Sequence, residues 1–580
     1  MLCVRLSKRH ENAQERAVQE GGSEVNRRKA AWGIGVLLLV AIVMMAMVGC
    51  GGTTTTTAAS TVTTAPAETT TTAPAETTTT APAETTTTAL QPVAGGTLTY
   101  VISSGPQDVG WWPKMGPTEE ASVFPGVERL MDYKDKKLQP FLAKSFVEDP
   151  TALTMTCELN QGIMFSDGTE LTADNAKWMY DIGIAGKKLQ YADAIKSVEV
   201  TGKYTFVIHL NYWHNQLIQM FGWMPMFSEA AYNKAGADDK ARQAWATDNL
   251  VGTGPFILKS YVRDQSLTWV KNPNYWAKGD QNLPYLDEVD VKVIPDMTTA
   301  TQMMQAGQAD ILAGDSQARD TMKKAGFIDQ SGWAGFLYHL MPNTVDPKSP
   351  CAKPEVRKAL EYAINKEEMT TSLGYGFDVP IYAVEPTSEW GGNAVTDPYK
   401  YDPAKAKSLL ASVGYSDTNP CKIDLMAIAS TGGGNSYAEA IKGYLDKAGF
   451  QTNLSIVDAG AFYGGVFGTG WKDVALMFSG MDPNGLISIN RWWSQTPMTN
   501  LASLGRPEDF KTLVNTANKA TDEAGQIAGA EAIVKYMHDN EMMIPLYESL
   551  TGISITDKVH TMYPAEGFIR WDWANTWKAK

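Results

Sequence analysis

A low-complexity tract near the N-terminus limits where a folded domain can begin. The sequence APAETTTT occurs three times, starting at Ala65, Ala73 and Ala81, and threonine, alanine and proline dominate residues 51–93. This composition offers too few apolar side chains to bury a core, so it predicts a disordered tether. The folded body is therefore expected to begin near residue 94 of the 580-residue chain.

The segment before the tether has the layout of a secretory signal. Basic residues 27–29 precede the apolar run AAWGIGVLLLVAIVMMAMV, which ends in MVGC at Cys50. That ending resembles the lipobox of bacterial lipoproteins, which implies lipidation of Cys50 and an extracytoplasmic body anchored to the cell membrane. The alternative is a single transmembrane anchor, because about 19 apolar residues could just cross a bilayer. The polar residues 1–24 add nothing to a signal, so Val25 is an alternative start within the 1–50 signal region.

The charge balance and the cysteines exclude several classes of function. Asp and Glu (64) outnumber Lys and Arg (50), which gives a net charge of −14. Binding to nucleic acid needs clustered Lys and Arg, so we expect no nucleic-acid partner. No cysteine or histidine cluster has metal-ligand spacing, and we expect no metal site and no cofactor. Among Cys157, Cys351 and Cys421 at most one disulfide could form, and the sequence favours no pair.

The rest of the chain alternates between strand and helix patterns. Residues 289–293 and 204–210 place apolar side chains at every second position, which is the period of a strand. Asp402 is positioned as the N-cap of a helix that Gly414 would end, and Gly449 separates a further helix from a strand. Helices followed closely by strands predict an α/β fold.

No catalytic signature is present. The chain contains no HExxH, GxSxG or GxxxxGK[ST] motif, and the glycine spacing of GGVFGTG (464–470) fits no nucleotide fingerprint, so it predicts a flexible turn. The acidic stretch SDGTELTADNAKW (166–178) has local structural roles instead of catalytic ones. Asp167 and Gly168 form a tight turn, and Thr172 is placed as the N-cap of a helix. We therefore expect no enzyme activity.

The same stretch carries a resemblance to a known family. Pro140, Leu142-Ala143, Ser145-Phe146, Phe165, Asp167-Gly168 and Leu171 to Asp174 resemble the signature of the family-5 extracytoplasmic solute-binding proteins of ABC transporters, which include oligopeptide-, dipeptide- and nickel-binding proteins. Departures from the pattern are Asn160, Glu170 and Asn175. The later blocks VGTGPFILKSY, KNPNYW, KPEVRKALEYAINKEEM and MIPLYESL resemble the family in the same order, so the resemblance covers residues 95–580.

The resemblance implies a two-lobed, periplasmic-binding-protein-like α/β fold with hinge crossovers and an extra subdomain on lobe I. Solute would sit in a cleft between lobes that close on it and dock on a permease. The implied ranges are 94–131, 247–325 and 546–580 for lobe I, 132–246 for the extra subdomain and 326–545 for lobe II. We expect a monomer.

The resemblance also points to candidate ligand-binding residues. In peptide-binding members an aspartate before an Asp-Pro step pairs with the amino terminus of the peptide, and the matching segment here is MFSGMDPNG with Asp482 before Pro483. No aspartate stands just upstream. Either Asp482 pairs with a ligand amine or the salt bridge is missing, and Asp482 could equally begin a turn.

Tryptophans supply the other candidates. Trp111, Trp112, Trp390 and Trp492 occupy loops where the family places its cleft, and Arg491 could hold a carboxylate. The alternative for each tryptophan is core packing, since one ring of a Trp-Trp pair commonly points inward.

Four classes of function remain open, and one of them, an adhesin or structural lipoprotein, is permitted by the threonine-rich tether alone. The first is a transport receptor for peptides. The second is a receptor of the same fold for an oligosaccharide or a metal chelate, which the missing upstream aspartate favours. The third is a secreted glycosidase with tryptophan-lined subsites and two carboxylates, which the absence of a catalytic motif disfavours.

Overall fold

The computed structural model describes residues 91–134, 137–279, 282–429, 435–480, 484–493, 501–561 and 571–580. These residues belong to one compact unit. The predicted signal with Cys50, the predicted tether and Asp482 lie outside the described residues. Within the described part of the chain, no helix is both long and apolar enough to cross a membrane.

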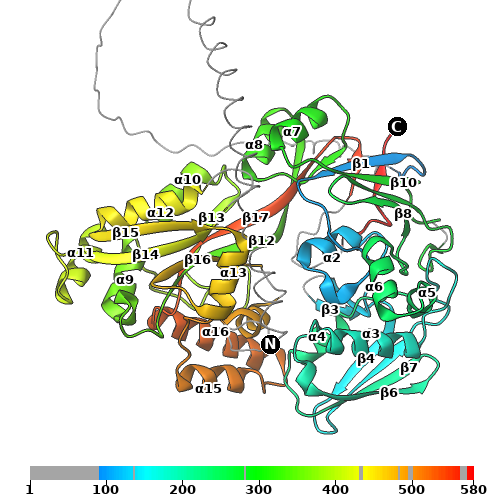
Figure 1. Cartoon of the computed structure of the whole chain (residues 1–580), viewed down its shortest axis with the longest axis horizontal. Coiled ribbons are helices and arrows are strands. Elements are labelled where there is room, and N and C mark those ends of the chain that lie inside the picture. The colour runs from blue at the N-terminus through cyan, green and yellow to red at the C-terminus, as the bar shows by residue number, and fades with distance from the viewer. Residues whose placement is uncertain are drawn as a thin grey trace, which may run out of the picture. The chain divides into compact units, whose positions relative to one another are not determined.

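One mixed sheet of 11 strands organises this unit (Figure 1). Its order is β15-β14-β16-β12-β17-β11-β1-β10-β9-β8, and β13 pairs with β17 outside this path. The strands are β1 (Thr97–Ile102), β8 (Phe256–Val262), β9 (Ser266–Lys271), β10 (Glu288–Val293), β11 (Ile311–Leu312), β12 (Ile328–Pro342), β13 (Asp378–Pro380), β14 (Cys421–Ile428), β15 (Phe450–Val457), β16 (Val474–Gly480) and β17 (Ile544–Ile555). The long strands β12 and β17 pair with each other and run through the positions where the sequence places the two crossovers.

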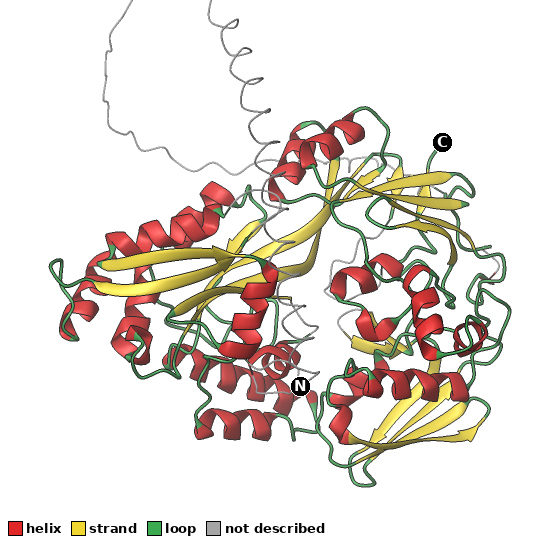
Figure 2. Ribbon diagram, viewed as in Figure 1, coloured by secondary structure: helices red, strands yellow, loops and turns green. Residues whose placement is uncertain are grey.

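A second, antiparallel sheet forms the core of the region expected to be the extra subdomain. Its order is β4-β5-β7-β6, with helices beside it (Figure 2). Its elements are β4 (Ala143–Asp149), β5 (Thr154–Leu159), β6 (Ile195–Gly202), β7 (Thr205–Leu210), α3 (Ala173–Ala185), α4 (Leu217–Gly222), α5 (Glu229–Lys234), α6 (Asp239–Asp248) and η2 (Ala192–Ala194). The chain reaches it through η1 (Trp112–Lys114), α2 (Pro117–Val123) and the pair β2 (Met131–Lys134) and β3 (Lys137–Pro140).

Helices cover both faces of the large sheet where β12, β14 and β16 lie. Along β16 the side chains alternate, so Val474 and Leu476 join one apolar cluster while Ala475 and Met477 join another. The first cluster is covered by α9 (Pro354–Ala363), α10 (Lys366–Leu373), α11 (Pro403–Ser412) and α12 (Ser436–Lys447). The second is covered by α13 (Ala459–Gly464), η5 (Gly465–Thr469), α14 (Gly485–Ser488), η6 (Ile489–Trp493), α15 (Glu508–Ala517) and α16 (Glu523–Asp539).

The remaining elements are short or peripheral. Helices α7 (Met297–Gln305) and α8 (Ser316–Lys324) follow β10 and β11, and their apolar side chains pack with Val101 of β1 and Leu312 of β11. The others are η4 (Pro350–Ala352), β18 (Val559–His560) and β19 (Trp577–Lys578).

Most local predictions are confirmed. Thr172 is the N-cap residue of α3, Asp402 accepts a hydrogen bond from the Lys405 amide at the start of α11, and Gly168 has a positive φ of 83°. The three cysteines Cys157, Cys351 and Cys421 are buried and free, so no disulfide joins them.

The predicted flexible turn at 464–470 is wrong. The chain continues from α13 directly into the π-helix η5 and leaves it at Gly470, where φ is 89°. Val466 and Phe462 are fully buried there, and their burial holds the glycine-rich segment in helical form.

Candidate functional site

The carboxyl ends of three parallel strands meet at one edge of the large sheet. Strand β14 pairs in parallel with both β15 and β16, so Ile428, Val457 and Gly480 end their strands at the same edge. Strand β12 runs antiparallel to β16 and places Phe336 opposite Gly480. In open α/β sheets ligands bind outside the carboxyl ends of the strands, so this edge is a candidate binding surface.

An aromatic platform lies at this edge. Tyr338 pairs directly with Phe478, and Phe336 follows on the same face of β12. The Phe336 and Phe478 ring centroids are 5.4 Å apart, and Tyr338 stacks on Tyr547 of β17 at 4.5 Å. Phe336 is 39% exposed, and a Cβ added at Gly480 would meet nothing within 4 Å. The open side of the Phe336 ring can therefore stack against an apolar or aromatic group.

Three of the predicted site residues come together next to this platform. The Trp492 Nε1–H donates to the Gly480 carbonyl at 3.3 Å, and the Arg491 guanidinium lies 4.8 Å from the centre of the Trp492 ring. An ideal Cβ at Gly485 would lie 2.1 Å from the Trp390 carbonyl oxygen, so the loop with Trp390 packs directly on the start of α14. The fold thus gathers Trp390, Arg491 and Trp492 near the end of β16 and the start of α14.

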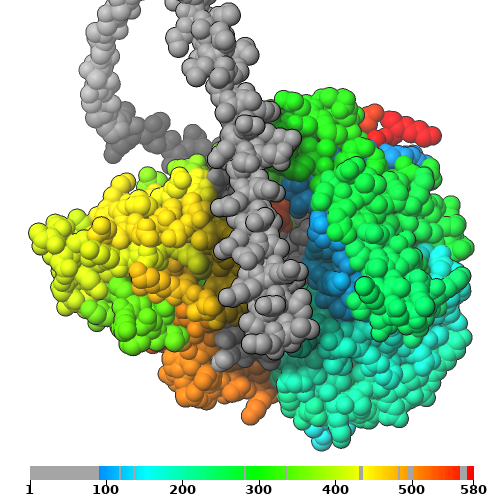
Figure 3. All heavy atoms as spheres, in the orientation of Figure 1, coloured from blue at the N-terminus to red at the C-terminus, as the bar shows by residue number. Residues whose placement is uncertain are grey.

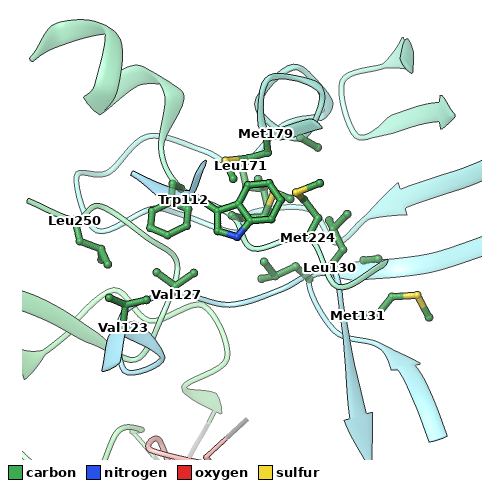
Figure 4. Close-up of a cluster of buried hydrophobic side chains, with 14 of the residues drawn as sticks. Trp112, Val123, Val127, Leu130, Met131, Leu171, Met179, Met224 and Leu250 are labelled. Carbon is green, nitrogen blue, oxygen red and sulfur yellow. The ribbon is translucent and has the colours of Figure 1, made fainter. Parts of the chain in front are cut away.

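Trp111 and Trp112 lie in a different part of the core, and Figure 4 shows the Trp112 ring among apolar side chains. Trp112 is 6% exposed, packs among Val123, Val127 and Met115, and donates its Nε1–H to Glu120 at 3.2 Å. Trp111 is 8% exposed and stacks on Tyr232 at 5.0 Å. The cavity beside Trp112 measures about 10 Å³, which holds roughly one water molecule and no solute. This placement favours the packing alternative for both rings.

A buried acid on a crossover strand was missed by the sequence interpretation. Glu548 of β17 is 7% exposed and pairs with Leu337 of β12 and Val379 of β13. Among the described residues none forms a hydrogen bond or ion pair with its carboxylate, and burial raises the pKa of Glu548 to about 7. Leu337 pairs in turn with Ser479, so Glu548 and the end of β16 share one row of the sheet.

The crossover strands are clamped by an arginine. The pairing of β12 with β17 is irregular between Ser331 and Gly335. Arg319 of α8 is 1% exposed. On β12 its Nε and Nη2 donate to Asp329 at 2.8 and 3.0 Å, and Nη2 also donates to Ser331. On β17 its Nη1 donates to the Leu550 carbonyl. One side chain therefore binds the strands on both sides of the irregular register.

The comparison with known proteins decides the family. Residues 137–500, more than half of the chain, match the family described as bacterial extracellular solute-binding proteins, family 5 Middle. The chain belongs to this family of solute-binding proteins.

Its relatives bind different solutes. The chain of this family-5 protein is 25% identical over 503 residues to a heme-binding protein A of Haemophilus influenzae, with 80% of this chain and 89% of that protein aligned. It is 25% identical over 458 residues to a nickel-binding periplasmic protein of Escherichia coli, with 74% and 84% aligned. Both relatives are binding proteins, and the family-5 protein is accordingly a solute-binding protein and not an enzyme.

Solved structures confirm the two-lobed α/β fold of the family-5 protein. The periplasmic binding protein DppA of Helicobacter pylori in complex with the peptide STSA has a TM-score of 0.72 at 20% identity, covering 84% of this chain and 99% of that one. NikA of Brucella suis in complex with Fe(III)-EDTA also has a TM-score of 0.72 at 20% identity, covering 83% and 100%. Within the described residues no cluster of acidic, histidine or cysteine side chains could hold a bare metal ion.

Proposed function

We propose that this family-5 protein is the lipid-anchored receptor of an ABC importer, and that it captures short peptides between its lobes for delivery to a permease. Cys50 would carry the lipid, and the body would act as an extracytoplasmic monomer. Trp390, Asp482, Arg491 and Trp492 would bind the solute together with Glu548, while Trp111 and Trp112 would pack lobe I on the extra subdomain. The similarity to peptide-binding proteins of the same fold supports this proposal.

The observation that carries the peptide assignment is a carboxyl, Glu548, and a guanidinium, Arg491, near the carboxyl end of β16. Glu548 lies on the face of the sheet opposite the Phe336 and Phe478 rings. Glu548, Leu337 and Ser479 lie in one row across three strands, which at the usual strand spacing spans about 10 Å. Arg491 lies beyond the end of this row, beside the strand end that Trp492 contacts. The row has the length of about three extended residues. A short zwitterionic peptide could place its amine at Glu548 and its carboxylate at Arg491.

A chelate or an oligosaccharide is the second candidate. A nickel-binding relative and a structure that holds Fe(III)-EDTA support the chelate. Because the described residues offer no cluster for a bare ion, Arg491 would hold the acidic groups of a chelator and the aromatic rings would hold its carbon frame.

A thermal-shift assay separates the candidates. We expect a pool of free-amine tripeptides to raise the melting temperature of the purified protein, because a ligand at a hundredfold excess over Kd adds about 2.7 kcal/mol to the native state. The same peptides with acetylated amines should give a smaller shift, since they cannot pair with a carboxylate. A flat response to both pools, together with a shift from a nickel chelate or cello-oligosaccharides, would replace the peptide assignment with the second candidate.

The anchor has its own test. Cys50→Ala should abolish the incorporation of labelled fatty acid and release the body from the membrane fraction. The variant Cys3→Ala serves as the control and should keep normal labelling. Labelling that survives Cys50→Ala would show that the N-terminal run anchors the protein in another way.

A further inference from the structure

A loop of the extra subdomain binds the end of a helix in lobe II. The backbone N–H of Asn215 donates to the Asn518 carbonyl at 3.0 Å. The Asn215 side-chain amide donates to the carbonyls of Ala517 and Ala520, both at 2.9 Å. These three bonds join residues that are about 300 positions apart in the sequence, and Figure 3 shows the orange and cyan surfaces that contain them side by side.

The chemistry of the contact is that of a helix cap supplied from another domain. The last carbonyls of a helix lack intrahelical partners and carry the negative end of the helix dipole. Helix α15 ends at Ala517, and Asn215 supplies donors to the carbonyls that emerge there. Asn215 is only 7% exposed, and its own side-chain oxygen accepts a hydrogen bond from Gln216 Nε2 at 2.9 Å, which fixes the orientation of the amide.

The contact continues to the candidate ligand-binding residues. Asn518 and Asn490 exchange two side-chain hydrogen bonds of 2.8 and 2.7 Å. Asn490 belongs to η6, and the next two residues of that element are Arg491 and Trp492. A shift of η6 on ligand binding would therefore move the partner of Asn518 and, through it, the carbonyls that Asn215 holds.

We propose that Asn215 is a closure-positioning residue, a latch on the far side of the ligand site from the crossover strands. The inference rests on the proposed function, because the latch matters only if solute enters between the lobes. The crossovers join the lobes at one place and Asn215 joins them at another, so solute can enter only when the Asn215 contact opens. Closing the contact then retains the bound solute, and Asn490 couples it to Arg491 and Trp492.

The test measures the opening without any ligand. Spin labels at Val147→Cys in the extra subdomain and Val345→Cys in lobe II report the distance between the two parts, since both side chains are more than half exposed. We expect Asn215→Ala to raise the ratio of open to closed molecules about tenfold, because it removes two side-chain hydrogen bonds. Asn215→Asp should open the protein at least as far, because a carboxylate would face two carbonyl oxygens. Asn211→Ala is the matched control, since the Asn211 side-chain amide donates to the Asp193 carbonyl within the subdomain.

Two results would overturn the latch. One is a folded Asn215→Ala variant with the same distance distribution as the wild type and Asn211→Ala. If the variant does not fold, hydrogen exchange of the wild type decides, because the latch requires protection of the Asn215 amide and free exchange there would refute it. Absence of a thermal shift with peptides would overturn the proposed solute and leave these ligand-free readouts unaffected.

Discussion

Burial of the Glu548 carboxyl predicts a pH dependence of the free energy of unfolding, and its size can be calculated. The carboxyl lies on β17 with 7% exposure, and burial raises its pKa from about 4.5 to about 7. In the unfolded chain the group ionises near its ordinary value, whereas the native protein keeps the proton up to about pH 7. Unfolding between these values therefore releases a proton, and native stability falls as the pH rises from 4.5 to 7.

The size of the effect follows from the pKa difference. About 2.5 pKa units at 1.36 kcal/mol each correspond to a loss of about 3 kcal/mol from this group between pH 4 and pH 8. Glu548→Gln keeps the shape of the side chain and cannot ionise. The free energy of unfolding of the variant, relative to the wild type, should therefore rise by about 3 kcal/mol over this pH range.

Urea unfolding followed by tryptophan fluorescence at several pH values measures this change. The difference between variant and wild type isolates Glu548 from other buried acids such as Glu361 and Asp378, whose pKa values burial also raises. Glu531→Gln on the exposed face of α16 is the control and should leave the pH profile unchanged. Parallel profiles for wild type and Glu548→Gln would refute the assignment of the titration to this carboxyl.

Two further predictions concern packing and the crossovers. Arg319→Met should lower the free energy of unfolding by about 3–5 kcal/mol in the same urea assay. The reason is that it leaves Asp329 with 11% side-chain exposure and no arginine partner. A loss below 1 kcal/mol would contradict the clamp. Gly183→Ala should destabilise the protein by about 1–3 kcal/mol, because the new Cβ would lie 2.5 Å from the Trp112 ring. In contrast, the new Cβ of Gly443→Ala in α12 would meet nothing within 4 Å, and this variant should stabilise the protein by about 0.5–1 kcal/mol.

The predictable features of this fold are those that depend on nearby residues. The cap at Asp402, the turn at Gly168 and the strand at 288–293 each follow from residue types within a few positions, and the structure has them. The prediction of a flexible turn at 464–470 failed for the opposite reason. Its helical form depends on the burial of Val466 against other elements, which no local pattern reveals.

The site could be anticipated only in part. Trp390, Arg491 and Trp492 were found through resemblance, and their proximity to the strand end agrees with a role in the cleft. Phe336 and Glu548 carry no local signal. Their position follows only from the strand register, in which Leu337 pairs with Ser479 on one side and with Glu548 on the other. This register joins residues that are more than 140 positions apart in the sequence.

The contacts at the crossovers bear on where the protein can open. Arg319 holds the strands across the first irregular register, and the Ile381 amide donates to the carbonyl of Leu546, which lies opposite the second irregularity between Tyr338 and His339. Both weak points of the crossover pair are therefore bound by a neighbouring element. Because the crossovers are stiffened in this way, we expect the balance between open and closed forms to depend mainly on the Asn215 contact and on the bound solute. A solute can shift that balance only by the difference between its affinities for the closed and the open form. A latch worth about 1–3 kcal/mol therefore sets how much of the binding free energy appears as measured affinity.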